Sequence, residues 1–438
     1  MPGRYALTLL LMLAPAGASA YGPSPAQRCT GVALQPGADL QRAVAASPAG
    51  TTFCLGAGVY ARQTVIPKDN DRFIGRYGAV LDGGLSRPHA FAGTASGVVI
   101  ENLKITRYAA AAQDSPVHGD DGHRWVVENN EISYNGGAGL DLGDHMRAVG
   151  NAIHHNLQIG VDMNGFGHHP GAGIVVEGNE IAFNNYTSAY DPGWEAGGTK
   201  FWNSIDLTVT NNYVHDNVGA GLWSDTDNIR TLYAGNRVEN NQGPGILHEV
   251  SYDAVIRDNI VRNNGSAERH RCPGWLWCAG ILISSSGAAK GSRGGIEIYG
   301  NTVVPGANGN GIGLVQNRRL RDAAEYGPHI VQNVHVHDNV VDLGTQRYGG
   351  RLNGNGAVSD DGETAIFTDR GNRFAHNVYC LRPGAKSFSW MDRQGGARYW
   401  RRMGQDRDGK FVYSDRGRSC FPLREGASNG QRNTAARN

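Results

Sequence analysis

The chain has 438 residues, a formal net charge of +1 and a charged fraction of 18%. A protein that binds nucleic acid carries a basic face, so this balance argues against nucleic acid as a partner. The 63 glycines would fit a low-complexity sequence, but they take part in a regular repeat.

The first 20 residues have the pattern of a secretory signal peptide. Arg4 precedes an apolar run over 5–13, and Ala18-Ser19-Ala20 supplies a cleavage site after Ala20. The apolar run is too short to span a bilayer, and no later segment is long enough. We therefore expect a monomer that is secreted or periplasmic, with no membrane span.

Residues 21–50 are predicted to form a polar lead-in and a short helix over 39–46. Leu40 and Val44 share one face of that helix. Short strands separated by turns follow over 51–379. Because the open end of a stack of strands exposes unpaired edges, we expect the helix to cover the first turn of the stack.

The segment 130–264 contains six copies of the pattern N-x-[IV]-x-x-N. Uninterrupted copies are 21 to 24 residues apart, which leaves room for three strands of about five residues with their turns. One such unit cannot bury its apolar face alone, so successive units must stack. Equivalent Asn side chains then hydrogen-bond along the stack, and we interpret them as structural. The copies begin at Asn130, Asn151, Asn179, Asn212, Asn236 and Asn259.

This repeat, with ADLQRAVAASPAGTTFCLGAGVY over 38–60, resembles the right-handed parallel β-helix of the pectin-lyase-like superfamily. The resemblance implies an all-β solenoid with an N-terminal capping helix. We place a small C-terminal cap at 380–424 and a disordered tail at 425–438. The superfamily includes lyases, hydrolases, epimerases and non-enzymes, so the resemblance is specific for the fold and weak for activity.

The six cysteines agree with export, because disulfides persist in oxidising compartments. Six cysteines allow fifteen pairings, and we expect neighbours in the sequence to pair. A metal site is the alternative, but no Cys-x-x-Cys or Cys/His spacing supports it. The expected pairs are Cys29 with Cys54, Cys272 with Cys278, and Cys380 with Cys420.

Two copies of the repeat are interrupted at the same position. In four copies a Gly follows the closing Asn by four residues, whereas ten residues are inserted after Asn184 and twelve after Asn264. Both insertions leave from the same corner, so we expect them to line one binding face. The candidate substrate-binding residues are Tyr190, Asp191 and Trp194 in the first insertion, Arg271 and Trp275 in the second, and His168 and His169 in a shorter insertion on the opposite rim.

Side chains alternate along the strand that begins at the repeat Gly. The residue after that Gly is apolar and is assigned to the core, so the next residue must face outward. The outward residues of three successive units are Asp141, Asp162 and Lys200, and we expect them to form a ladder. Its predicted neighbours are Trp202, Trp223, Asp225 and Glu249, with Glu195 at the end of the first insertion.

Two carboxylates on adjacent turns, about 4.8 Å apart, repel each other unless a cation or a proton lies between them. One interpretation is a solvated ion ladder in which Lys200 neutralises Asp162. The functional interpretation assigns Ca²⁺ to Asp141 and Asp162 and proton abstraction to a Lys200 of lowered pKa. Exposed Trp and Tyr side chains would then bind sugar rings.

This combination looks like the arrangement in β-helix polysaccharide lyases, which implies β-elimination on an acidic polysaccharide. An inverting glycoside hydrolase is the alternative, with Asp141, Asp162 and either Asp225 or Glu249 as acid and base. A uronate epimerase, with His168, His169 or Tyr190 as second acid, and a non-catalytic carbohydrate-binding or surface protein also remain open. The HGDDGH segment over 118–123, one turn before Asp141, either extends the groove or, as we interpret it, forms a polar turn, and His248 is interpreted as a hydrogen-bonded core histidine.

Overall fold

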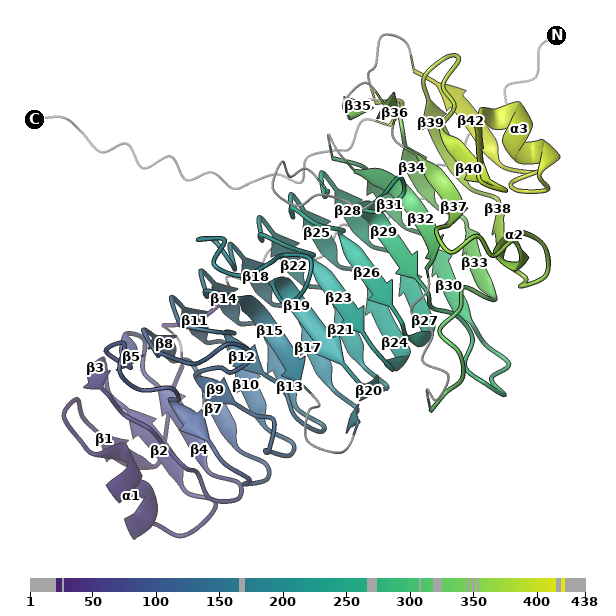
Figure 1. Cartoon of the computed structure of the whole chain (residues 1–438). Helices are drawn as coiled ribbons and strands as arrows, with labels where there is room; N and C mark the ends of the chain where they lie inside the picture. Colours follow the sequence, from purple (N-terminus) through teal and green to yellow (C-terminus); the bar gives the residue numbers. More distant parts are fainter. Residues whose placement is uncertain are drawn as a thin grey trace, which may run out of the picture.

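The computed structural model describes residues 21–25, 27–164, 170–265, 274–306, 309–317, 325–344, 347–348, 351–352, 354–414 and 419–421. The chain winds into an elongated coil whose turns each add strands to three long sheets (Figure 1). We call these sheets A, B and C. The strands pair in parallel within the coil, apart from the last pair of sheet C. The predicted right-handed parallel β-helix is therefore confirmed.

Sheet A contains β1 (Val32–Leu34), β2 (Thr52–Leu55), β4 (Arg72–Gly75), β7 (Val99–Glu101), β10 (Val126–Glu128), β13 (Arg147–Val149), β17 (Val175–Glu177), β21 (Thr208–Thr210), β24 (Ile229–Ala234), β27 (Tyr252–Arg257), β30 (Ile296–Tyr299), β33 (Val334–His337) and β38 (Arg373–Ala375), with β16 (Gly171–Ala172) and β20 (Ser204–Ile205) paired beside them. Sheet B contains β3 (Gly58–Ala61), β5 (Ala79–Asp82), β8 (Lys104–Thr106), β11 (Glu131–Ser133), β14 (Ala152–His154), β18 (Glu180–Ala182), β22 (Tyr213–His215), β25 (Arg237–Glu239), β28 (Ile260–Arg262), β31 (Thr302–Val304), β34 (Val340–Asp342), β39 (Val378–Leu381) and β42 (Lys410–Tyr413).

Sheet C contains β6 (Phe91–Ala92), β9 (Val117–His118), β12 (Leu140–Asp141), β15 (Ile159–Asn164), β19 (Gly197–Trp202), β23 (Leu222–Asp225), β26 (Ile246–Glu249), β29 (Ala279–Ser284), β32 (Asn310–Gln316), β37 (Asn355–Ser359), β40 (Phe388–Trp390) and β41 (Arg393–Gly395). The remaining elements are the antiparallel pair β35 (Arg347–Tyr348) and β36 (Arg351–Leu352), and the helices α1 (Leu40–Ala46), α2 (Ala365–Thr368) and α3 (Ala397–Arg402).

The repeat asparagines form two buried hydrogen-bonded ladders at the corners on either side of sheet B. In each step, the side-chain oxygen of one Asn accepts from both the backbone N–H and the side-chain amide of the Asn one turn earlier. The first ladder joins Asn130, Asn151, Asn179, Asn212, Asn236, Asn259, Asn301, Asn339 and Asn377 and ends on Asp406. The second joins Asn135, Asn156, Asn184, Asn217, Asn241 and Asn264. The structural interpretation of these residues is confirmed.

Both ends of the coil are covered (Figure 1). The side chain of Asp39 accepts from the backbone N–H of Arg42 at 2.9 Å and caps α1, whose Leu40 and Val44 are buried in the core. At the other end, α3 buries Trp400 in the same core. The predicted domain boundaries stay predictions, and the segments 1–20 and 425–438 lie outside the described residues.

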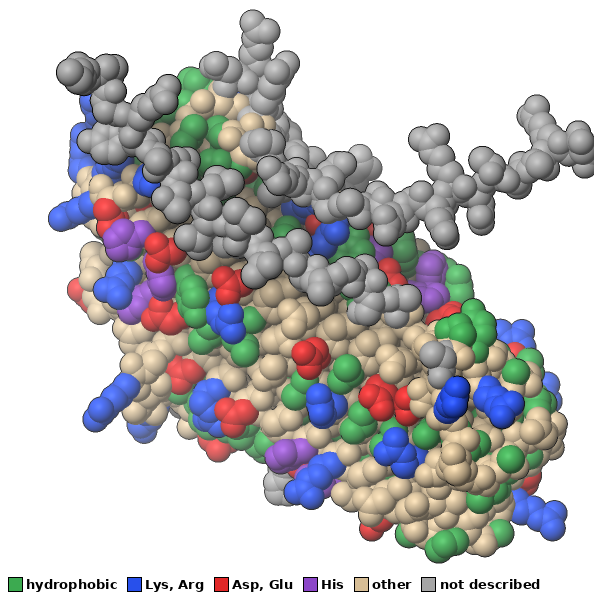
Figure 2. Space-filling model, turned by 180° about the vertical axis from the view of Figure 1, so that it is seen from behind, with side chains coloured by type: hydrophobic (Ala, Val, Ile, Leu, Met, Phe, Trp, Pro, Cys, Tyr) green, Lys and Arg blue, Asp and Glu red, His purple; other side chains and the backbone are tan. Residues whose placement is uncertain are grey.

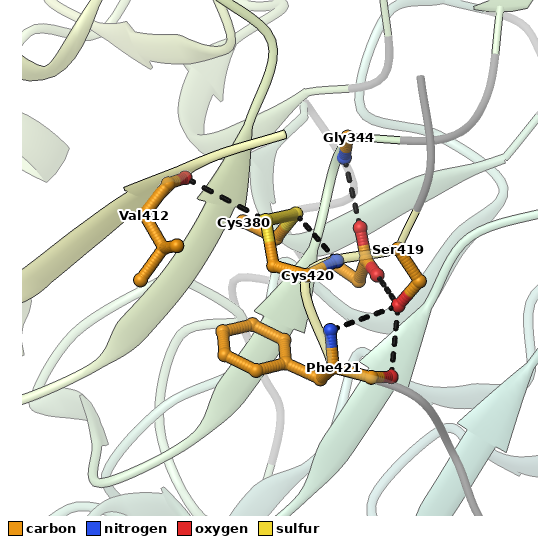
Figure 3. Close-up of a disulfide and its surroundings, with 7 residues drawn as sticks. Gly344, Cys380, Val412, Ser419, Cys420 and Phe421 are labelled. Atoms are coloured by element: carbon orange, nitrogen blue, oxygen red, sulfur yellow. Dashed lines mark hydrogen bonds between the residues drawn. A yellow bond between two sulfur atoms is a disulfide. The ribbon is translucent and has the colours of Figure 1, made fainter. Parts of the chain in front are cut away.

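Disulfides join Cys29 to Cys54 near the first turn and Cys380 to Cys420 near the last. In Figure 3 the backbone N–H of Cys420 also donates to Cys380 Sγ at 3.1 Å. These two pairs are as predicted, whereas Cys272 lies outside the described residues. No helix in the described part of the chain is long and apolar enough to cross a membrane. On the face in Figure 2, acidic and basic side chains are interspersed, which fits the near-neutral net charge.

His248 is a buried core histidine, as the sequence predicts, but the hydrogen bond expected for its ring is not found among the described residues. Strand alternation turns it inward, between Ser224 and Ile283 of the neighbouring turns. It is fully buried, and neither ring nitrogen has a hydrogen-bond partner among the described residues. Burial therefore lowers its pKa to about 4.

Substitution of a ladder asparagine should destabilise the fold. Asn217 Oδ1 accepts from the backbone and side chain of Asn184, and its Nδ2 donates to Ile181 O and Asn241 Oδ1. Asn217→Ala leaves these buried groups unpaired, so the free energy of unfolding in urea should fall by about 3 kcal/mol. The control Gln394→Ala removes an exposed carboxamide and should change it little. Equal effects in both variants would contradict the role of the ladder.

The buried His248 should make stability fall with acidification. The unfolded histidine titrates near pH 6.5 and the folded one near pH 4, so between these values the unfolded chain binds the proton more readily. Stability from the neutral ring is present above about pH 6.5 and is lost as the pH falls towards 4, by about 2 kcal/mol at pH 5. Urea unfolding of the wild type and of His248→Phe at pH 7 and pH 5 measures this loss of unfolding free energy. The variant should lose less than the wild type, and an equal loss in both proteins would contradict the role of His248.

Candidate functional site

The structure brings the predicted ladder residues onto consecutive strands of sheet C. Asp141 is in register with Asp162, and Asp162 with Lys200. The ladder has a fourth member, because His118 of β9 is in register with Asp141. The inward neighbours Leu140 and Val161 are fully buried in the core, so alternation along the strands turns all four ladder side chains to the outer wall of sheet C.

This wall is largely buried, so the expectation of exposed aromatic side chains holds for Trp194, which is 60% exposed, but not for Trp223. Asp141, Asp162 and Lys200 are only 0%, 2% and 5% exposed. The described parts of both insertions fold onto this wall, and the first brings the Trp194 carbonyl and Glu195 to Lys200. Residues 274–278 pack Leu276 and Trp277 over Trp223, which is 4% exposed. Burial of apolar surface drives this closure.

Lys200 is held by three oxygen atoms of the same region. Its Nζ donates to Trp194 O at 2.9 Å and to Glu195 Oε1 at 2.5 Å, and it forms an ion pair with Asp225 Oδ2 at 3.0 Å. It also lies 4.4 Å from the centre of the Trp223 ring. Burial acts to lower the pKa of Lys200, but Asp225 and Glu195 outweigh it and raise that pKa. The predicted lowering of the pKa is wrong, because two of the predicted neighbours, Asp225 and Glu195, contact the ammonium directly.

The two carboxylates in the middle of the ladder lack donors. Neither oxygen of Asp141 has a hydrogen-bond partner among the described residues, and its ion pair with His118 Nδ1 is long, at 3.5 Å. Asp162 Oδ1 accepts from the backbone N–H of Met163 at 3.0 Å, while Oδ2 has no described partner. Burial raises the pKa of both groups, and their mutual repulsion raises that of Asp162 further.

The HGDDGH segment forms a turn, as predicted, and its His118 also extends the ladder by one strand. His118 Nδ1 forms an ion pair with Asp114 Oδ1 at 3.0 Å, and this contact, with that to Asp141, raises the His118 pKa to about 10. Burial and the nearby Asp141 raise the pKa of Asp120 to about 8. The sequence places this segment one turn before Asp141, but the exact register of His118 with Asp141 comes from the structure, because the preceding unit lacks the asparagine pattern.

The other predicted site residues differ in how close they lie to Lys200. Asp225 is in register with Trp202 and Glu249, so these three lie on consecutive turns, and Asp225 contacts Lys200. Trp194 is 60% exposed above Lys200, and Trp275 is half-buried against the Trp223 cluster. His168, His169 and Arg271 lie outside the described residues.

Tyr190 and Asp191 shape the first insertion. The Asn185 side chain bonds both the backbone N–H and the carbonyl oxygen of Tyr190, at 3.1 and 2.9 Å. Asp191 Oδ1 accepts from the backbone N–H of Gly193 at 2.9 Å, and its carbonyl accepts from the N–H groups of Trp194 and Glu195. These bonds hold the backbone that presents Glu195 and the Trp194 carbonyl to Lys200.

Asp141 and Asp162 fit the predicted Ca²⁺ by donor type. Together they offer three carboxylate oxygens without a hydrogen-bond donor among the described residues. Ca²⁺ takes oxygen ligands, and an unpaired buried carboxylate is costly unless a proton or cation compensates it.

Comparison with known proteins agrees with this architecture. The family described as "Right handed beta helix region" matches residues 117–303. No curated protein sequence matches the chain. The A-module of mannuronan C-5 epimerase AlgE6 from Azotobacter vinelandii is 14% identical with a TM-score of 0.55, over 86% of this chain and 93% of that one. A structure of XylC with xylose is 11% identical with a TM-score of 0.57, over 85% and 82% of the two chains. The chain thus has the fold of a right-handed parallel β-helix.

Proposed function

We propose that the protein is an exported enzyme that hydrolyses a polysaccharide bound beside the ladder on the outer wall of sheet C. Two disulfides support export, because such bonds persist outside the cytosol. The similar structures act on mannuronan or hold xylose by their titles, which supports a carbohydrate as the substrate. The exposed indole of Trp194 at the rim offers an apolar surface suited to a sugar ring.

The observation that carries the choice of reaction is the set of contacts around Lys200. A lysine acts as a base only after it loses its proton, and two carboxylates at 2.5 and 3.0 Å stabilise the ammonium form. Lys200 therefore fits the role of a fixed cation better than that of the base in β-elimination. Its charge is available to orient a polar substrate and to balance the carboxylates around it.

Carboxyl groups are then the candidates for proton transfer. Glycoside hydrolysis commonly uses two of them, one that protonates the leaving oxygen and one that activates water. Asp162 has an oxygen with no described partner and lies one turn from Lys200, so we assign it the first role. Asp225 and Glu249, which are in register with each other on the next turns, are the candidates for the second.

β-Elimination on an acidic polysaccharide is the second candidate. The oxygens of Asp141 and Asp162 without described donors favour it, because these residues would hold a Ca²⁺ ion. A bound cation would neutralise the uronate carboxylate, on which negative charge develops during proton removal. The products separate the two reactions, because elimination leaves a double bond that absorbs ultraviolet light and hydrolysis does not.

Hydrolysis should depend on Asp162. The mature chain should release reducing ends from one member of a panel of neutral and acidic polysaccharides, without a rise in ultraviolet absorbance. Asp162→Asn should lower kcat at least about 100-fold, because acid–base catalysis contributes that much. The control Asp206→Asn alters an exposed pair with Arg230 and should keep activity. Unsaturated products would favour elimination instead, and binding without turnover would favour a non-catalytic protein.

Trp194 should act in substrate binding. Trp194→Ala keeps the backbone carbonyl that Lys200 contacts and removes only the exposed ring. Loss of one aromatic contact of about 1 kcal/mol should raise KM about fivefold and leave kcat nearly unchanged. The control is Tyr77→Ala, which removes another exposed ring near the N-terminal cap. A fall in kcat with KM unchanged would contradict a binding role for Trp194.

A further inference from the structure

Three metal-ligating side chains converge at the N-terminal end of the ladder. One ligand atom from each of His118, Asp120 and Asp141 lies within 4.8 Å of the other two. Asp162, the expected partner of Asp141 in a calcium site, belongs to no such group among the described residues. We infer that His118, Asp120 and Asp141 bind a divalent transition-metal ion, with Zn²⁺ as its representative.

The state of Asp141 is the second, independent observation. Its carboxylate is 0% exposed, and neither oxygen accepts a hydrogen bond from the described residues. The ion pair with His118, at 3.5 Å, is too long to replace these hydrogen bonds. A buried carboxylate without donors is costly, and coordination to a metal ion is one of the usual ways in which proteins satisfy it.

Two glycines bring the turn that carries Asp120 against the strand of Asp141. A Cβ atom on Gly119 would lie 2.6 Å from the carbonyl oxygen of Asp141, and one on Gly143 would lie 2.2 Å from the carbonyl oxygen of Gly119. The N–H of Gly122 closes the turn on Gly119 O at 2.8 Å. The three ligands are thus held by a tight turn and two paired strands, so little ordering is needed when the ion binds.

Asp114 is a positioning residue for His118. It contacts His118 Nδ1 at 3.0 Å and His89 Nε2 at 2.9 Å, and the two imidazole rings stack with their centres 4.9 Å apart. With Nε2 as the ligand atom, a carboxylate on the other ring nitrogen, Nδ1, is the recurrent arrangement that orients a metal-binding histidine and raises the affinity for the metal. Asp114 therefore holds the His118 ring beside Asp141.

The ligand types decide the class of metal. Ca²⁺ takes oxygen ligands, whereas a set of one imidazole and two carboxylates suits Zn²⁺ and its neighbours in the first transition series. Three protein ligands leave a coordination position open for water or substrate. The site lies one turn from Asp162, but metal binding can be measured without any turnover, so its outcome does not depend on the proposed hydrolysis.

The test is titration of the chelator-treated mature chain with Zn²⁺ by calorimetry and with Co²⁺ by visible absorption. The wild type should bind one tight equivalent, which His118→Ala and Asp120→Asn should each weaken at least about 100-fold. Asp114→Asn should weaken it about 10- to 100-fold. A thermal unfolding scan of each variant shows whether it is folded. If His118→Ala does not fold, the binding measurement on Asp120→Asn carries the test.

A matched control separates this site from another group on the surface. His123, Asp144 and His145 also place ligand atoms within 4.8 Å of one another, and His145→Ala should leave the tight equivalent unchanged. Three results would each overturn the assignment: binding of Ca²⁺ but not Zn²⁺ or Co²⁺, unchanged binding in both His118→Ala and Asp120→Asn, or loss of binding in His145→Ala.

Discussion

Hydrogen bonds between stacked asparagines set the register on which the rest of the molecule depends. Each ladder step fixes the height and the phase of one turn relative to the next. Because side chains alternate along a strand, a slip of one residue would turn Asp162 and Lys200 into the core and apolar residues outward. The same ladder also anchors the C-terminal cap, since Asp406 accepts from the Asn377 amide, Tyr379 Oη and Trp400 Nε1.

That register places a row of charged side chains on one buried wall, the outer wall of sheet C. The ladder runs from a cation at His118 through two carboxylates to a cation at Lys200. Each terminal cation is already matched by acidic neighbours, Asp114 at one end and Glu195 with Asp225 at the other. The carboxylates of Asp141 and Asp162 in the middle are left without equivalent compensation, and this imbalance is the physical reason to look for protons, cations or substrate there.

The insertions give this wall its chemical environment. The backbone of the first delivers the Trp194 carbonyl and Glu195 to Lys200, and the second packs Leu276 and Trp277 over Trp223. Ion pairs that are shielded from water interact more strongly than exposed ones. The covering segments therefore do more than line a groove, because they determine which groups stay charged.

The sequence by itself determined the stack, the caps, two of the disulfides and the wall shared by Asp141, Asp162 and Lys200, because these follow from a local period and from strand alternation. Only the tertiary structure decided that Trp223 is covered, that Lys200 is held as an ammonium, and that His118 joins the ladder with Asp120 beside it. These features depend on how irregular segments fold back over the wall and on contacts between turns that lack the repeat pattern. Neither produces a periodic pattern in the amino-acid sequence.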